Sequence, residues 1–124
     1  GFPTFEVPGF KFGKHHHREE TGSPEELDRE PTREDEAILR SFAERYMPAG
    51  TGPTMRLSAC MYTNTPDRDF ILDVHPDHPN VVLGAGFSGH GFKFASAVGE
   101  VLADLATEGR TDHPTEMFEL SRFE

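Results

Sequence analysis

The sequence predicts an α+β fold with about five short strands and two main helices, at about residues 33–47 and 92–107. Two stretches carry apolar residues at helical spacing. Several short apolar or aromatic runs are bounded by Pro and Gly, which is typical of strands joined by turns. At 124 residues the chain is long enough to bury the core of one small domain.

The N-terminal part is expected to begin with strands at residues 2–5 and 10–15, separated by a turn at Pro8-Gly9. Residues 16–32 are polar and favour a loop, in which Ser23-Pro24-Glu25-Glu26 has the form of a brief helix start.

The first main helix follows from a local start signal. Thr32-Arg33-Glu34-Asp35 resembles a capping box, and Pro48 predicts the end of the helix. Apolar residues recur between them at helical spacing: Ile38, Leu39, Phe42 and Tyr46.

The C-terminal part is expected to hold three strands, at residues 55–63, 70–74 and 81–84. Turns at residues 65–67 and 76–80 separate them. The last helix then has Gly109 as its C-cap.

The loop from Gly84 to Gly89 matches the dinucleotide-binding pattern G-x-G-x-x-G, after an apolar strand and before a helix. A dinucleotide fold needs a second parallel strand after that helix, ending in an acidic residue. Here the helix leads into residues 109–116, which are polar and contain Pro114. A nucleotide site is therefore the least favoured interpretation, although the loop still suits partial negative charge.

Composition excludes several partners. The net charge of −10 disfavours nucleic acid, because phosphate binding needs clustered Lys and Arg. No apolar run approaches the roughly 18–20 residues of a membrane helix, so no membrane partner is expected. Cys60 is the single cysteine, which excludes an internal disulfide and favours a reducing, cytoplasmic location.

Two strings and the first fifteen residues together resemble one family. The strings are Cys60-Met61-Tyr62-Thr63 and Gly86-Phe87-Ser88-Gly89-His90-Gly91-Phe92-Lys93. They resemble the C-terminal part of monomeric sarcosine oxidases, pipecolate oxidases and N-methyltryptophan oxidases, which are FAD-dependent amine oxidases of the D-amino-acid oxidase superfamily. The resemblance covers nearly the whole chain. It implies oxidation of secondary or N-methyl amino acids by O2, with release of hydrogen peroxide.

The resemblance also implies residues that bind the cofactor. Cys60 matches the cysteine that forms a thioether to the flavin, so FAD would be covalent at Cys60 in a complete enzyme. A lone cysteine in a strand is otherwise a small buried hydrophobe. The other matching positions are Met61, Gly89, His90, Gly91 and Phe92, and the glycine-rich backbone would stabilise negative charge on the reduced flavin.

Catalytic and substrate-binding residues are implied in the same way. Lys11 matches a lysine that helps O2 accept electrons, and His15 matches an active-site histidine. On a strand both would project from one face. Lys93 matches the lysine that pairs with the substrate carboxylate, while Tyr62 and Phe2 match pocket positions. Without the resemblance these would be solvated lysines and ordinary packing residues.

The run His15-His16-His17 invites a metal interpretation, but neighbouring strand residues point to opposite faces and no third ligand is fixed by spacing. No metal is expected.

The family's N-terminal nucleotide-binding part has no counterpart here, so we expect a fragment of a two-domain FAD-dependent oxidase that is inactive alone. Residues 1–55 would belong to the substrate domain and residues 56–124 to the FAD-binding domain. Expected partners are a small amino acid, O2 and either the missing N-terminal part or a partner chain, with self-association through unpaired strands. The alternative is a catalytically silent domain that binds a partner chain or a small acidic ligand.

Overall fold

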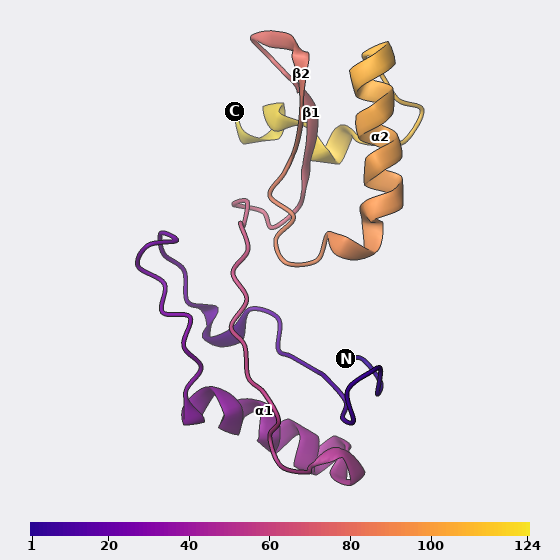
Figure 1. Cartoon of the computed structure of the whole chain (residues 1–124). Coiled ribbons are helices and arrows are strands. Elements are labelled where there is room, and N and C mark those ends of the chain that lie inside the picture. The colour runs from indigo at the N-terminus through magenta and orange to yellow at the C-terminus, as the bar shows by residue number, and fades with distance from the viewer. The chain divides into compact units, whose positions relative to one another are not determined.

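The computed structural model describes all residues from 1 to 124, and it divides into two compact units, Gly1–Cys60 and Met61–Glu124. Each unit is described by itself (Figure 1). The division falls five residues after the expected boundary between residues 55 and 56, whose assignment to a substrate domain and a flavin domain stays a prediction. The α+β class is confirmed, with two α-helices and one two-stranded sheet.

The first unit is built around helix α1 (Arg33–Tyr46), within one residue of its predicted end. Thr32 and Asp35 form the predicted capping box: the Asp35 amide donates to Thr32 Oγ1 at 3.3 Å, and the Thr32 amide donates to Asp35 Oδ2 at 2.8 Å. Both bonds satisfy amides that the helix itself leaves without acceptors. Short 3₁₀ turns lie on either side, η1 (His17–Glu19) and η2 (Pro48–Gly50).

The two strands expected at residues 2–5 and 10–15 are wrong. Phe2 pairs with Lys11 in one isolated antiparallel bridge, and Phe5 pairs with Val7 in another. Strands need a continuous ladder of interstrand hydrogen bonds, and isolated bridges that each pair only one residue with one other cannot supply it. The brief helix at Ser23 is a single turn, in which the amides of Glu26 and Leu27 both donate to the Ser23 carbonyl.

Little of the first unit is buried. Ala43 on α1 is its one buried residue. An aromatic cluster instead packs along one side of the helix, with ring centroids 5.2 Å apart for Phe10 and Phe12 and 4.7 Å apart for Phe42 and Tyr46. Phe42 and Tyr46 keep 51% and 59% of their surface exposed.

The second unit contains the sheet, formed by β1 (Ile71–His75) and β2 (His78–Ala85) as an antiparallel hairpin. These correspond to the strands expected at residues 70–74 and 81–84, and β2 begins three residues earlier because the hairpin turn is tighter than predicted. The strand expected at residues 55–63 is wrong, since that segment finds no strand to pair with.

Helix α2 (Ala95–Glu108) runs alongside the hairpin and makes contact with both strands (Figure 1). The helix predicted at residues 92–107 therefore opens with a 3₁₀ turn, η3 (Phe92–Phe94), and ends at Gly109 as expected. The core is formed by residues of β1, its preceding residue and α2: Phe70, Leu72, Val98 and Val101. No strand follows α2, so the second strand of a dinucleotide fold is absent from the described chain.

The C-terminal tail closes the second unit through η4 (Glu116–Phe118) and η5 (Leu120–Phe123), both in contact with β1. Phe118 stacks on Phe70 with ring centroids 5.5 Å apart. The Leu120 amide donates to Asp73 Oδ2 at 2.8 Å, which fixes the tail against the strand. None of the helices is long and apolar enough to cross a membrane.

Candidate functional site

In the first unit, two of the predicted site residues lie side by side. The Phe2 amide donates to the Lys11 carbonyl at 2.6 Å, and the Lys11 amide donates back at 3.1 Å. The Lys11 ammonium lies 5.9 Å from the centre of the Phe2 ring, within the range of a cation–π contact. Phe2 is 66% exposed, so this pair presents an aromatic face and a positive charge to the surface.

His15 lies four residues further on, at a turn rather than on a strand, so the strand argument that gave it a common face with Lys11 does not apply. Its ring centroid is 4.0 Å from that of His16. His17 instead contacts Asp35 at the start of α1, Nε2 to Oδ1, at 2.8 Å. No group of three or more potential metal ligands occurs in the described chain.

Asp35 is held ionised by its surroundings. The backbone amide of Thr32, His17 and the Thr32 hydroxyl all donate to its carboxylate, which holds the pKa of Asp35 well below its usual range. His17 therefore contacts the capping box at the start of α1.

Cys60 is exposed, and its thiol is free. Met61 is 44% exposed, and Tyr62 is half-buried. The segment that carries them is irregular in structure, without strand partners. An exposed thiol meets the steric requirement for covalent attachment of a cofactor, since the reacting sulfur must be accessible.

The glycine-rich loop between β2 and α2 reverses direction through three residues with positive φ: Gly86 at 62°, Ser88 at 49° and Gly89 at 77°. Gly86 is buried against Thr65, whose methyl group occupies the place where a side chain at position 86 would begin. Only glycine fits this combination of backbone angle and close approach.

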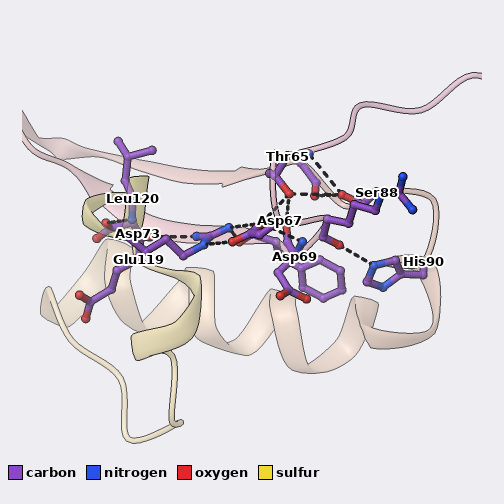
Figure 2. A network of polar contacts seen from close by, with 12 residues as sticks. Thr65, Asp67, Asp69, Asp73, Ser88, His90, Glu119 and Leu120 are labelled. Carbon is purple, nitrogen blue, oxygen red and sulfur yellow. Dashed lines mark hydrogen bonds and ion pairs between the residues drawn. The ribbon is translucent and has the colours of Figure 1, made fainter. Parts of the chain in front are cut away.

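A buried polar network ties this loop to the segment after Cys60 (Figure 2). The Ser88 amide donates to the Thr63 carbonyl at 3.0 Å, and the Thr65 amide lies 3.4 Å from Ser88 Oγ. Ser88 Oγ in turn donates to the Gly86 carbonyl at 2.9 Å. Ser88 is fully buried, and Thr65 is 7% exposed. Thr63, the last residue of the Cys60–Thr63 string, is therefore hydrogen-bonded to the glycine-rich loop.

The same network continues through the turn at residues 65–67 to the tail. Thr65 Oγ1 lies 2.9 Å from Asp67 Oδ1 and 2.6 Å from the Asp69 carbonyl, and these two acceptors share its proton. Arg122 donates through Nε to Asp67 Oδ2 at 2.6 Å and through Nη2 to the Phe70 carbonyl at 2.6 Å. The Arg122 guanidinium and then the Asp69 amide hold the pKa of Asp67 well below its usual range.

Four predicted site residues follow Ser88 directly. Gly89 completes the turn, and the His90 amide donates to the Phe87 carbonyl at 2.9 Å. The His90 ring lies 5.1 Å from the Phe70 ring, and its Nε2 is 2.9 Å from the Arg68 carbonyl (Figure 2). Gly91 precedes the 3₁₀ turn, in which Phe92 is 95% exposed.

Lys93 stands in the same 3₁₀ turn, exposed, with its ammonium 5.3 Å from the centre of the Phe94 ring. Seven predicted residues of the second unit therefore lie on the two segments that the Ser88–Thr63 hydrogen bond joins: Met61, Tyr62, Gly89, His90, Gly91, Phe92 and Lys93.

Sequence reasoning missed the residues that hold these loops together, Thr65, Ser88 and Arg122. The turn at residues 65–67 is recognisable, and Asp67 is a typical turn residue whose carboxylate accepts from an amide two residues on, as it does from Asp69 at 3.0 Å. Nothing in the sequence pairs that turn with an arginine 55 residues later.

Comparison with known proteins gives a consistent result. The model of the family described as FAD dependent oxidoreductase (DAO) matches residues 5–105. The monomeric sarcosine oxidase of Bacillus sp. (strain NS-129) is 49% identical over 124 residues, covering 98% of this chain and 32% of that protein. The peroxisomal sarcosine oxidase of Homo sapiens is 43% identical over 126 residues, covering 99% of this chain and 32% of that protein.

Two further similarities broaden the set. The N-methyl-L-tryptophan oxidase of Escherichia coli O139:H28 is 42% identical over 127 residues, covering 100% of this chain and 33% of that protein. Among solved structures, L-proline dehydrogenase from P. horikoshii matches with a TM-score of 0.72 and 35% identity, covering 77% of this chain and 26% of that one. The chain spans about a third of the length of the curated relatives it matches.

Proposed function

Because the chain belongs to the family of FAD dependent oxidoreductases, we propose that it forms the C-terminal part of a sarcosine oxidase-like flavoenzyme. In this proposal the enzyme oxidises secondary or N-methyl amino acids with O2, giving an imine and hydrogen peroxide. The names of the relatives support the substrate class, since sarcosine, N-methyltryptophan and proline are all amino acids with a secondary amine.

The observation that carries the proposal is the hydrogen bond between the Ser88 amide and the Thr63 carbonyl, 3.0 Å long. It joins the string that ends three residues after Cys60 to the string that contains Gly89, His90 and Gly91. This contact between the two strings supports the proposal that both contribute to a flavin site.

The residues present fit the reactive part of a flavin. The amides of Ser88 and His90 are already engaged by backbone carbonyls, whereas the amides of Gly89 and Gly91 have no backbone acceptor in the chain. These two N–H groups are suited to hold negative charge on the flavin, and the exposed Cys60 thiol is suited to covalent attachment. When bound, FAD accepts the two electrons released by the amine.

The remaining predicted residues have roles in this proposal that follow from their charge and shape. Lys93 pairs with the substrate carboxylate, and Tyr62 and Phe2 line the pocket. Lys11 supplies fixed positive charge that favours electron transfer to O2, and His15 completes the active site. Met61 and Phe92 contact the cofactor. Residues 1–55 belong to the substrate domain and residues 56–124 to the FAD-binding domain.

The test is a hybrid enzyme in which this chain replaces the aligned third of the Bacillus monomeric sarcosine oxidase. We expect the hybrid to release hydrogen peroxide with sarcosine, and to keep flavin absorbance on the polypeptide after denaturation. Cys60→Ser should abolish that covalent flavin. Lys93→Met should raise the KM for the amino acid, because it removes the partner of the substrate carboxylate. The absorbance of the bound flavin should stay nearly unchanged.

The competing function is a catalytically silent domain that binds a partner chain or a small acidic ligand. A hybrid that is folded and binds FAD, but oxidises none of sarcosine, N-methyltryptophan and proline, would favour that alternative. So would a folded hybrid that never retains flavin.

A further inference from the structure

The tail residue Arg122 is far from the flavin motifs in sequence, yet it is well anchored. Its side chain is 16% exposed and donates to Asp67 Oδ2, to the Phe70 carbonyl at 2.6 Å and to the Glu119 carbonyl at 2.9 Å. Each of the three guanidinium nitrogens therefore donates to a different acceptor. A charge-assisted fork of this kind fixes the geometry of its partner more firmly than an exposed ion pair does.

Asp67 passes this constraint on to Thr65. Its Oδ1 lies 2.9 Å from Thr65 Oγ1 and accepts from the Asp69 amide at 3.0 Å. Since Oδ2 is held by Arg122, the carboxylate cannot rotate to another partner without losing that bond. The fixed carboxylate of Asp67, together with the Asp69 carbonyl 2.6 Å away, therefore holds the Thr65 hydroxyl in place.

Thr65 contacts Ser88 at the centre of the glycine-rich loop. The two hydroxyl oxygens are 3.5 Å apart, and the Thr65 amide is 3.4 Å from Ser88 Oγ. Ser88 has a φ of 49°, which a serine adopts only at a cost in energy, so the surrounding contacts must hold it there. Gly89 and His90 follow immediately, and their positions depend on this strained residue.

We propose that Arg122 is a positioning residue, which acts through Asp67, Thr65 and Ser88 to set the conformation of the loop from Gly89 to Gly91. The inference rests on the proposed function only for its consequence, which is that the tail controls the placement of the loop assigned to the flavin. The hydrogen-bonded path itself exists without any cofactor.

The experiment measures amide hydrogen exchange in the 124-residue chain, without FAD, for Arg122→Gln and Arg122→Lys. We expect Arg122→Gln to speed exchange of the Ser88 and His90 amides by about tenfold or more, the effect of losing hydrogen bonds to a charged group. The Val101 amide in α2 should change by much less. Arg122→Lys should restore part of the protection, because an ammonium can still reach one of the acceptors.

Arg110→Gln is the matched control. Arg110 is an exposed arginine of the same unit, paired only with the exposed Asp112 at 3.3 Å. Its loss should change the Ser88 exchange rate by less than about threefold. Small guanidinium compounds at low concentration should also slow Ser88 exchange in Arg122→Ala, and not in the Arg110→Gln control.

Two outcomes would overturn the proposal. Equal acceleration at Ser88, His90 and Val101 would show that Arg122 only stabilises the whole unit. Unchanged exchange at Ser88 and His90 would show that the path carries no constraint. Both results are independent of flavin, so a failed hybrid enzyme with an intact path would count against the proposed function alone.

Discussion

At the scale of single residues, Gly86 combines two demands that no other residue meets. Its φ is 62°, and a Cβ atom there would collide with the methyl group of Thr65. We expect Gly86→Ala to destabilise the second unit by about 1–3 kcal/mol, from backbone strain together with the steric clash. The loss is measured as the change in the urea concentration at the midpoint of unfolding, with hydrogen exchange of the Val101 amide as the probe of the second unit.

The double variant Gly86→Ala/Thr65→Ser separates the two causes. Serine at position 65 keeps the hydroxyl and removes the methyl group, which relieves the clash but leaves the backbone strain at position 86. We expect the double variant to lose less free energy of unfolding than the sum of the losses of the two single variants. Strict additivity of the two substitutions would contradict the predicted collision.

Asp67 makes the stability of the second unit depend on pH. Its folded-state pKa is lowered below the ordinary 3.8, chiefly by Arg122 and then by the Asp69 amide. A lowered pKa means that the folded state binds the proton less readily than the unfolded state. The contribution is therefore fully present above pH 3.8 and is lost as the pH falls from there toward the folded-state pKa.

We accordingly expect wild-type unfolding midpoints to be steady above pH 3.8 and to fall below it. In Asp67→Asn the unfolding midpoint should fall less steeply below this pH, so the midpoints of the two proteins should converge at low pH. Urea titrations at a series of pH values measure these midpoints. A wild-type and a variant curve that stay parallel throughout would show that Asp67 does not carry the dependence.

The residues proposed to take part in the chemistry could be named from the sequence, whereas the contacts that hold the neighbouring loops could not. Cys60 and Lys93 stand in recognisable strings. The partners of Thr65 are Ser88 and Asp67, and the partner of Asp67 is Arg122, at separations of 23 and 55 residues for the two distant pairs. Contacts of that kind depend on the tertiary fold, and residue type alone does not specify them.

At the scale of elements, alanine substitutions at two glycines of α2 and its C-cap should change the stability of the second unit in opposite directions. Gly99 lies exposed inside the helix with nothing near its Cβ position, and Gly109 ends the helix with a φ of 70°. Gly99→Ala should stabilise the unit by about 0.5–1 kcal/mol, because alanine loses less backbone freedom on folding. Gly109→Ala should destabilise it by about 1 kcal/mol through backbone strain alone.

Thermal unfolding of both variants measures this pair, with Gly109→Asn as a further control. Asparagine tolerates the left-handed conformation better than alanine does, so its loss should be smaller. Two alanine variants that shift the melting temperature in the same direction would contradict the assignment of Gly99 to the interior of α2 and of Gly109 to its C-cap.

The two helices were predictable because their signals are local. The capping box at Thr32 and the terminal Gly109 are read from a few consecutive residues, and both occur as expected. Strands depend on partners elsewhere in the chain. Strands β1 and β2 are adjacent in the sequence and pair with each other. The segment at residues 55–63 has no strand to pair with and stays irregular.

At the scale of the whole molecule, the two units differ in how much they bury. The second has a core of Phe70, Leu72, Val98 and Val101, against which Phe118 of the tail packs. The first buries Ala43 and leaves large apolar side chains open to solvent, among them Phe2, Phe5, Phe42, Tyr46 and Met55. A surface of that kind is typical of an interface that another polypeptide covers.

We therefore expect the 124-residue chain to self-associate when it is studied alone. Its net charge of −10 opposes association, so added salt should increase the associated fraction by screening the repulsion. Light scattering coupled to size-exclusion chromatography, over a range of protein and salt concentrations, measures this. Phe42→Ser/Tyr46→Ser should reduce the associated fraction, because it removes two exposed rings of the aromatic cluster.

Met117→Ser is the matched control, since Met117 is 56% exposed but belongs to the second unit. It should leave the association unchanged if the aromatic cluster of the first unit is the interface. A chain that stays monomeric at every concentration and binds no apolar dye would contradict the expectation, and so would equal effects of the two substitutions. Association that salt weakens would instead indicate ion pairing between copies, because screening reduces attraction between opposite charges as it reduces repulsion between like ones.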